Sequence, residues 1–373
     1  MVVLIRCNDV ISDPRAMKYV KYLEDNHQEY ILIGWDREGK MEDSKNRIYY
    51  HKRAGFNVGG MTAVKNRIGW MRFVVKTLLS LKLKGGLIHA CDLDAAYPAV
   101  IYNKLKCKKN KSKVLFDVFD WYSATLSALP WLFLNAFAVM EKTAVKGSKY
   151  IVICEPERID QIPYKIEEER LFVLPNIPYF NDSSFLMKEE SMTFHNDKLI
   201  FSYVGSFTKT RCINEIVTAA EKGLINLQIA GFGDPVLEGR LEQLKGHENI
   251  KYYGKVKYTD GLNIMYNSDV VYAMYSVTVP NHVYAAPNKY YEAMFLGKAL
   301  FTTQGTIVEK KTMKNNTGFV SGESQEEIEN TIRSISRDNV FKFGEHAHRL
   351  WKNEFSHYTD DWLNNEYKRI IIS

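Results

Sequence analysis

The sequence predicts an α/β protein with two doubly wound domains. Short apolar runs alternate with longer helical patterns through both halves of the chain, which is typical of parallel βα units. The chain has 373 residues, more than one hydrophobic core usually holds. A polar, aperiodic stretch interrupts the alternation near the middle. We therefore expect two domains of similar size, facing each other across a cleft.

The apolar runs define six expected strands in each half. In the first half they are 2–7, 30–35, 87–91, 113–117, 150–154 and 171–174. In the second half they are 199–204, 227–230, 250–253, 270–274, 299–302 and 318–320. The run Ser324-Gln325-Glu326-Glu327 is a capping-box pattern, and it predicts the start of a late helix.

The boundary between the halves is expected near residue 180. Pro175-Asn176-Ile177-Pro178 is turn chemistry, and residues 181–198 are polar and aperiodic. Residues 1–180 and 181–354 then form the two domains. Ligands of such folds bind beyond the carboxyl ends of the strands, so functional residues should follow strands directly.

Composition excludes several classes of protein. No run of about 18 uncharged apolar residues exists, so no membrane-spanning helix is expected, and the N-terminus is too short for a signal peptide. The five cysteines are scattered and never spaced Cys-x-x-Cys, which favours a reduced, cytoplasmic protein without structural zinc. No motif for nucleic-acid binding accompanies the net charge of +6.

Two basic segments, 65–84 and 104–113, contain no acidic residue. They are solvated faces, or they attract anionic lipid or a phosphorylated substrate. Residues 63–83 show helical periodicity with Trp70 and Phe73 opposite the expected core face, which favours contact with a membrane surface. A core helix with snorkelling lysines is the alternative. Residues 126–140 are apolar but too short to span a bilayer, so they predict a buried helix or a second monotopic element.

The segment 286–298 carries the most specific signal. Pro287 predicts a helix start and Gly297 a helix stop, with one carboxylate, Glu292, in the second turn of an aromatic segment. The beginning of a helix favours a phosphate, and a carboxylate one turn deeper can accept hydrogen bonds from sugar hydroxyls. This pairing indicates a nucleotide sugar, whereas a solvated glutamate is the alternative.

Two further loops follow strands of the second half. Gly205 permits close approach of a ligand, and Lys209 and Arg211 place cations beside it that can hold a diphosphate. A surface loop with solvated cations is the alternative. Gly231-Phe232-Gly233 is a lone Gly-x-Gly, which an ordinary βα turn also explains.

In the first half, Asp117 and Asp120 end a strand among aromatic residues. Asp120 is a candidate base or orienting group for an acceptor, or it caps the following helix. Arg15, after the first strand, faces the cleft or only begins a helix. His89 lies near Cys91, Asp92 and Asp94, but their spacing matches no zinc pattern, so a structural histidine is favoured and no metal site is expected.

In their order, these motifs resemble the family-four glycosyltransferases of the GT-B fold, particularly those of surface-polysaccharide synthesis. The resemblance is carried by residues 12–15, 33–37, 89–94, 117–123, 173–176, 203–205, 229–233, 253–254, Glu292 and 297–298. It implies transfer of a sugar from a UDP- or GDP-linked donor to a glycan or lipid-linked acceptor, usually with retention, and without a metal or cofactor. It also implies an acceptor domain at 1–180, a donor domain at 181–354 and a final helix, about 355–373, that crosses back.

The resemblance also assigns roles by position. The implied catalytic residues are Asp120, Arg211 and Lys289; the donor-binding residues are Gly205, Lys209, Arg211, Gly231, Phe232, Tyr284, Asn288, Lys289 and Glu292; the acceptor-side residues are Arg15, Asp120 and Trp121. Glu292 would bind the ribose, and Arg211 with Lys209 would bind the diphosphate. The enzyme would act in the cytoplasm, at the inner face of the cell membrane.

The sequence departs from the family pattern at three positions. Tyr284 stands where many members carry a first glutamate, Ser206 where an arginine is common, and Phe119 where a histidine is common. Lys289 is a candidate substitute cation. These departures leave open the identity of the donor sugar nucleotide and the stereochemistry of transfer. Two alternatives to a glycosyltransferase also remain: a nucleotide-sugar epimerase of the same fold, and an inactive homologue that acts as an assembly partner.

Overall fold

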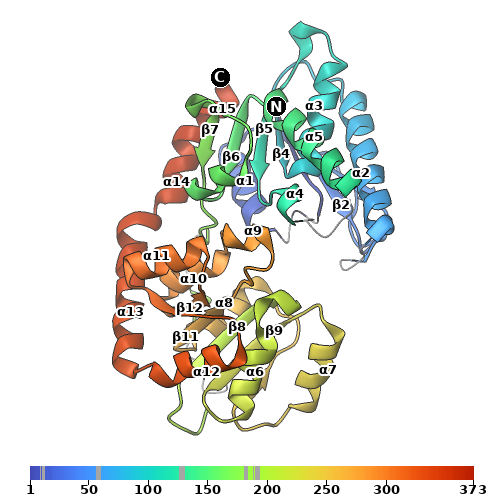
Figure 1. The fold of residues 1–373 in the computed structure, drawn as a ribbon. Helices are drawn as coiled ribbons and strands as arrows, with labels where there is room; N and C mark the ends of the chain where they lie inside the picture. Colours follow the sequence, from blue (N-terminus) through green and yellow to red (C-terminus); the bar gives the residue numbers. More distant parts are fainter. Residues whose placement is uncertain are drawn as a thin grey trace. The chain divides into compact units, whose positions relative to one another are not determined.

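The computed structural model describes residues 1–8, 10, 13–55, 60–125, 131–179, 184–187, 189 and 194–373. Ser12, residues 126–130 of the apolar segment, and residues 180–183, 188 and 190–193 around the expected linker lie outside the described residues. The chain forms two compact units, each with its own parallel sheet (Figure 1). Unit 1 comprises Met1–Pro175 and Thr359–Ser373, and unit 2 comprises Asn176–Tyr358.

Unit 1 is built on a seven-stranded parallel sheet in the order β3-β2-β1-β4-β5-β6-β7. The strands are β1 (Val2–Arg6), β2 (Tyr30–Asp36), β3 (Arg47–His51), β4 (Leu87–Cys91), β5 (Lys113–Val118), β6 (Tyr150–Ile153) and β7 (Leu171–Val173). All six strands predicted for this half are present. The sequence prediction missed β3, because this edge strand is polar and buries only Tyr49.

Helices cover both faces of the first sheet. They are α1 (Pro14–Asp25), α2 (Gly60–Ser80), α3 (Leu93–Lys104), α4 (Tyr122–Thr125), α5 (Trp131–Gly147), α14 (Tyr358–Trp362) and α15 (Lys368–Ile372), with a π-helical turn at Leu363–Tyr367. Helices α2, α3 and α5 form one layer, with α3 between the other two (Figure 1). On the other face, the ring of Tyr19 from α1 packs against Trp362 and Tyr367 at the end of the chain.

Helix α2 corrects one expectation. Trp70, predicted to face away from the core, is fully buried and stacks on Trp35 at 5.9 Å between ring centroids. Apolar residues occur on every side of this helix, so periodicity alone does not identify its core face. The space beside Trp35 is filled by Trp70, the largest side chain of the helix. The aromatic basis for membrane contact through α2 was therefore wrong. No described helix, α2 included, is long and apolar enough to cross a membrane.

Unit 2 is built on a six-stranded parallel sheet in the order β10-β9-β8-β11-β12-β13. The strands are β8 (Ile200–Ser206), β9 (Asn226–Phe232), β10 (Ile250–Tyr252), β11 (Val270–Ala273), β12 (Ala299–Thr303) and β13 (Gly318–Ser321). All six strands predicted for this half are present, with ends displaced by one or two residues.

Two helical layers enclose the second sheet (Figure 1). The helices are α6 (Ile213–Glu221), α7 (Pro235–Gln243), α8 (Tyr258–Tyr266), α9 (Pro280–Val283), α10 (Asn288–Leu296), α11 (Ile307–Asn315), α12 (Gln325–Ser334) and α13 (Arg337–Leu350). Side chains of α6, α7 and α12 fill one core cluster, and those of α8, α10 and α11 fill another. The capping box predicted at Ser324 is confirmed: its hydroxyl accepts from the Glu327 N–H, and the Glu327 carboxylate accepts from the Ser324 N–H.

Candidate functional site

The strand order of each sheet locates a candidate site. In unit 2, β8 lies beside β11, so connections leave these neighbouring strands toward opposite faces of the sheet. Open parallel sheets bind ligands at such a switch point, beyond the carboxyl ends of the strands. In unit 1, the equivalent neighbours are β1 and β4. Lys209, Arg211 and Tyr284 lie in segments that follow these strands, and the following helices α1 and α10 carry Arg15, Asn288, Lys289 and Glu292.

The loops after β8 and β11 contact each other directly. The guanidinium carbon of Arg211 lies 3.9 Å from the centroid of the Tyr275 ring, within the range of a cation–π interaction. The Ser276 N–H donates to the Thr210 carbonyl at 2.9 Å. Lys209 is exposed in the same loop. The contacts hold Arg211 at the switch point, with its Nη1 buried and without a hydrogen-bond partner among the described residues.

Glu292 lies inside unit 2, on helix α10. Its side chain is 2% exposed, and its Oε1 accepts a hydrogen bond of 2.9 Å from the Tyr258 hydroxyl. Its Oε2 has no hydrogen-bond partner in the described part of the chain, and the Lys289 Nζ lies 4.0 Å away. Leaving a buried carboxylate oxygen unpaired is costly. A ligand hydroxyl that donates to Oε2 would remove this cost.

Lys289 connects α10 to the end of β8. A Cβ added at Gly205 would lie 3.6 Å from its Nζ, which is van der Waals contact, so the ammonium group lies directly beside this strand end. Burial lowers the pKa of Lys289; Glu292 opposes this shift, and Arg211 adds to it. Two cations thus lie close enough to repel each other in a poorly hydrated place. An anionic ligand would stabilise both.

The start of α10 adds backbone donors to these cations. Pro287 occupies the N-cap position without a side-chain cap, and Asn288 is the first helical residue. The N–H groups of an uncapped first turn are available to an anion. Tyr284, which ends α9 just before this turn, is partly exposed. The predicted stop of the helix is confirmed at Gly297, whose φ of +65° is left-handed.

The glycine turn after β9 has a packing function. A Cβ on Gly231 would lie 1.9 Å from the Gly205 carbonyl oxygen, so only glycine allows the two strand ends to approach this closely. Phe232, the next residue, is 40% exposed, and the Lys255 Nζ lies 4.8 Å from its ring centroid. Phe232 is therefore accessible to a ligand, whereas Gly231 acts through the backbone.

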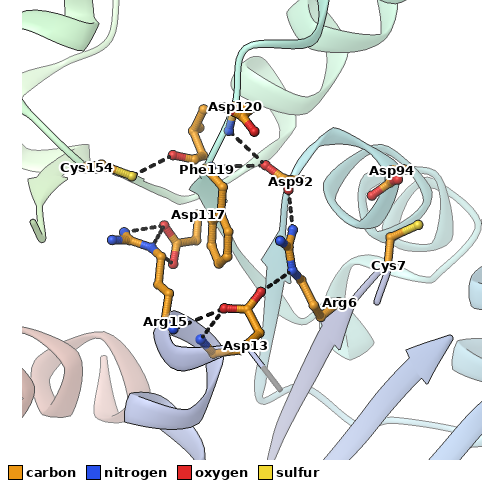
Figure 2. A network of polar contacts seen from close by, with 12 residues as sticks. Arg6, Cys7, Asp13, Arg15, Asp92, Asp94, Asp117, Phe119, Asp120 and Cys154 are labelled. Atoms are coloured by element: carbon orange, nitrogen blue, oxygen red, sulfur yellow. Dashed lines mark hydrogen bonds and ion pairs between the residues drawn. The ribbon is translucent and has the colours of Figure 1, made fainter. Parts of the chain in front are cut away.

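A polar network occupies the switch point of unit 1 (Figure 2). Arg6, at the end of β1, forms ion pairs with Asp13 and Asp92. The Asp92 Oδ1 accepts from the backbone N–H groups of Phe119 and Asp120, at 3.0 and 3.1 Å. Asp92 has a φ of +71°, a strained value for a residue with a side chain. Burial raises the pKa of Asp92 to about 7, although Arg6 opposes the shift.

Arg15 is held in a buried ion pair. Its side chain is 6% exposed, and its guanidinium donates to Asp117 at 2.7 Å and to the Leu174 carbonyl at 2.6 Å (Figure 2). Burial favours the protonated form of Asp117, but Arg15 and His89 together outweigh this and hold the pKa of that carboxyl well below its usual range. The expectation that Arg15 contacts an acceptor is corrected here: its position is that of a structural ion pair.

Asp120 and Trp121 differ in accessibility. The Asp120 side chain is 52% exposed, with the Arg158 Nη2 3.8 Å from its Oδ1. Trp121 is 3% exposed and belongs to the core of unit 1, because its ring fills the space beside Tyr164. Among the three predicted acceptor-side residues, Asp120 is accessible, and Trp121 supports the turn from beneath.

His89 lies in the interior of unit 1, as the sequence spacing favoured. Its Nδ1 is 2.9 Å from the Tyr367 hydroxyl, and its Nε2 is 3.5 Å from the Asp117 Oδ2. His89, Cys91 and Asp117 bring potential ligand atoms within 4.8 Å of one another. However, the Arg15 guanidinium already neutralises Asp117, and a metal cation there would be repelled.

Sequence reasoning missed two partners of the candidate site. Tyr275 follows β11 directly, so its position after a strand was a usable signal. Tyr258 had none, because it is 34 residues from Glu292 and belongs to another helix. The Arg6–Asp92 pair was missed for the same reason, since 86 residues separate its members.

Comparisons with known proteins agree with this geometry. Residues 187–357 match the model of the family described as glycosyl transferases group 1. This segment contains Arg211, Lys289 and Glu292. A search of curated proteins by sequence finds no match.

Several solved structures resemble the whole chain. A sucrose-phosphate synthase from Thermosynechococcus elongatus has a TM-score of 0.72 at 14% identity, covering 99% of this chain and 98% of its own. A UDP-forming α,α-trehalose-phosphate synthase from Burkholderia xenovorans, in complex with glucose-6-phosphate, has a TM-score of 0.68 at 11% identity, covering 98% and 99%. WaaG, a glycosyltransferase involved in lipopolysaccharide biosynthesis, has a TM-score of 0.65 at 14% identity, covering all of both chains. The predicted fold class is therefore confirmed: the chain has the GT-B fold of two Rossmann-like domains, and its second domain matches the group 1 glycosyl transferase model.

Proposed function

We propose that this protein is a glycosyltransferase that moves a sugar from a nucleoside-diphosphate donor to an acceptor hydroxyl. One observation carries the proposal: near the start of a helix, Glu292 has a buried oxygen without a hydrogen bond among the described residues, beside the cations Lys289 and Arg211. A carboxylate oxygen can accept hydrogen bonds from the hydroxyls of a ribose, and neighbouring cations can bind the diphosphate attached to that ribose. The family match over residues 187–357 supports the assignment.

In this proposal the Glu292 Oε2 accepts hydrogen bonds from the ribose, and Lys289 and Arg211 hold the diphosphate. During transfer, the bond from the anomeric carbon to the diphosphate breaks, a bond to the acceptor oxygen forms, and the acceptor proton passes to the departing diphosphate. The two cations and the first-turn N–H groups of α10 stabilise the departing diphosphate, which is electrostatic catalysis. Gly205, Lys209, Phe232, Tyr284 and Asn288 line this donor site. Within unit 1, the accessible Asp120 is our candidate for a group that binds an acceptor hydroxyl.

We extend the proposal to a UDP-linked or GDP-linked hexose, transferred with retention to a glycan or lipid-linked glycan at the cytoplasmic face of the membrane. A UDP-forming synthase and a lipopolysaccharide glycosyltransferase among the structural neighbours support this choice. Lys289 and Arg211 replace a metal ion as the charges that neutralise the diphosphate. Unit 1 then serves as the acceptor domain and unit 2 as the donor domain.

The test is a thermal-shift screen of the full chain with UDP, GDP, ADP and their common sugars. We expect one nucleotide to raise the melting temperature. Replacing Glu292 by Gln should weaken its affinity about 10- to 100-fold, because a hydrogen bond to a charged group contributes roughly 1.5–3 kcal/mol. The exposed Glu345 on α13 is the matched control, and Glu345→Gln should leave the affinity unchanged.

Three outcomes would contradict the proposal. Unchanged nucleotide affinity and turnover in Glu292→Gln would remove Glu292 from the site. Absence of a shift with every nucleotide would favour an inactive assembly partner. Conversion of the donor sugar to its epimer without an acceptor would favour an epimerase. Analysis of products with and without acceptor separates the last case from transfer.

A further inference from the structure

Helix α5 of unit 1 exposes large apolar side chains. Trp131, Leu132 and Val139 are 71%, 63% and 64% exposed, and Ala136 is exposed between them. Leu132, Ala136 and Val139, spaced by four and three positions, share one side of the helix. They form an apolar stripe, and the exposed Trp131 adjoins it in the first turn. Exposed apolar patches of this kind mark sites of interaction.

The charges around this stripe are all positive. Lys142 and Lys146 are exposed on the following turns of α5. The single acid of the helix, Glu141, is 1% exposed and accepts a hydrogen bond from the Ser123 N–H, so it does not contribute to the surface. The outer face of α5 therefore combines apolar side chains with cations and presents no acidic group.

Helix α2 has a second surface of the same character. It contains no Asp or Glu in 21 residues. Its exposed side chains include three cations and two aliphatic groups, Lys65, Ile68, Arg72, Lys76 and Leu79, together with the hydroxyls of Thr62 and Ser80. Trp70 is buried, so the aliphatic residues, and not the aromatic ring, make the outer face of this helix apolar.

The two faces belong to one layer. Helices α2 and α5 flank α3 on the same face of the first sheet (Figure 1). Each connects two parallel strands, α2 leading into β4 and α5 into β6, so each runs back from the carboxyl edge of the sheet. The first half of α2, with Lys65 and Ile68, and the first turn of α5, with Trp131 and Leu132, therefore lie toward the edge where Asp120 follows β5.

We propose that the outer faces of α2 and α5 bind the surface of an anionic lipid bilayer. Tryptophan and leucine insert at the level of the headgroups, while lysine and arginine pair with anionic lipids. Charge complementarity selects this occupant. A second copy that docked through the same surface would place lysines against lysines, because no acid lies on the exposed side of either helix. Bound in this way, the layer would bring the carboxyl edge of unit 1 toward an acceptor anchored in the membrane. The anchored acceptor rests on the proposed function, whereas lipid binding by α2 and α5 does not.

Flotation of the full chain with vesicles tests the surface without any substrate. Wild-type protein should float with vesicles of phosphatidylcholine containing 30% phosphatidylglycerol, and much less with pure phosphatidylcholine. Neutralising three cations of α2 with Lys65→Gln, Arg72→Gln and Lys76→Gln should weaken partitioning roughly 100-fold, because each basic residue near an anionic membrane contributes about 1 kcal/mol to binding. Trp131→Ser with Leu132→Ser should weaken it at least 10-fold. The matched control is Val236→Ser, which removes an apolar side chain that is 82% exposed on α7 of unit 2.

Tryptophan fluorescence gives an independent readout. The chain has six tryptophans, all within the described residues, and Trp131 is the one that is exposed while the other five are buried. Iodide should quench the emission of Trp131 selectively in solution. Anionic vesicles should protect this fraction from quenching, and Trp131→Phe should abolish both effects.

Two results would overturn the proposal. One is wild-type protein that fails to float with anionic vesicles, or variants of α2 and α5 that float as well as wild type. The other is a dimer, measured by light scattering, that dissociates on Trp131→Ser while vesicles give no protection from iodide. Nucleotide-induced thermal shifts of the same variants should equal that of wild type, so a failure of membrane binding is distinguishable from a failure of the donor site.

Discussion

At the scale of single residues, Lys18 shows how burial controls charge. Its side chain on α1 is 3% exposed, and its Nζ has no hydrogen-bond partner among the described residues. Burial, with a smaller contribution from Arg15, lowers the pKa of Lys18 to about 7. The unfolded chain keeps this proton up to about pH 10.4. Unfolding therefore takes up a proton between pH 7 and 10, and stability rises with pH across that window.

Replacing Lys18 by Met should remove this dependence and stabilise the protein at pH 7 by about 2–4 kcal/mol, because an unpaired buried amine is replaced by an apolar chain of similar length. Denaturant unfolding at pH 7, 8.5 and 10 measures both effects. Lys21→Met is the control, since Lys21 forms an exposed ion pair with Asp25 and should change stability by less than about 0.5 kcal/mol. A Lys18→Met variant that is less stable than wild type at pH 7 would refute the assignment.

At the scale of elements, the close pairing of the carboxyl ends of β8 and β9, with Gly205 opposite Gly231, determines where the donor-side loops lie. Gly231→Ala would place a methyl group 1.9 Å from the Gly205 carbonyl oxygen, so the strand ends must separate. We expect a loss of about 2–4 kcal/mol in stability and weaker nucleotide binding. Gly239, in the middle of α7, has no atom within 4 Å of the added Cβ, and Gly239→Ala should stabilise by about 1 kcal/mol. Equal effects of the two substitutions on unfolding would contradict this account of Gly231.

At the scale of the whole molecule, the two units have separate cores and separate switch points. A nucleotide should protect amides of unit 2 from hydrogen exchange in three places: the loop after β8, the loop after β11 and the first turn of α10. Protection follows because bound phosphate immobilises these N–H groups. Hydrogen-exchange mass spectrometry with and without the nucleotide measures it. Protection that starts in unit 1 and spares unit 2 would place the donor site elsewhere.

Much of this fold follows from local sequence patterns. All twelve predicted strands are present, because each is a short apolar run bounded by turns, and parallel strands buried on both faces have that signature. The sequence did not predict β3, because this edge strand is partly exposed and does not form an apolar run. The helix start at Pro287 and the stop at Gly297 were also readable, since both depend on single residues with restricted or permissive backbones.

The sequence by itself therefore determined the sheets, the loops at their carboxyl ends and the presence of Glu292 near a helix start. Tertiary structure decided which of the candidate side chains remain available. It buried Arg15 against Asp117, turned Trp70 into the core and placed the Tyr258 hydroxyl on Glu292. The reason is physical: backbone propensity acts over a few neighbouring residues, whereas ion pairing and close packing join groups tens of residues apart, and only the folded chain brings them within contact distance.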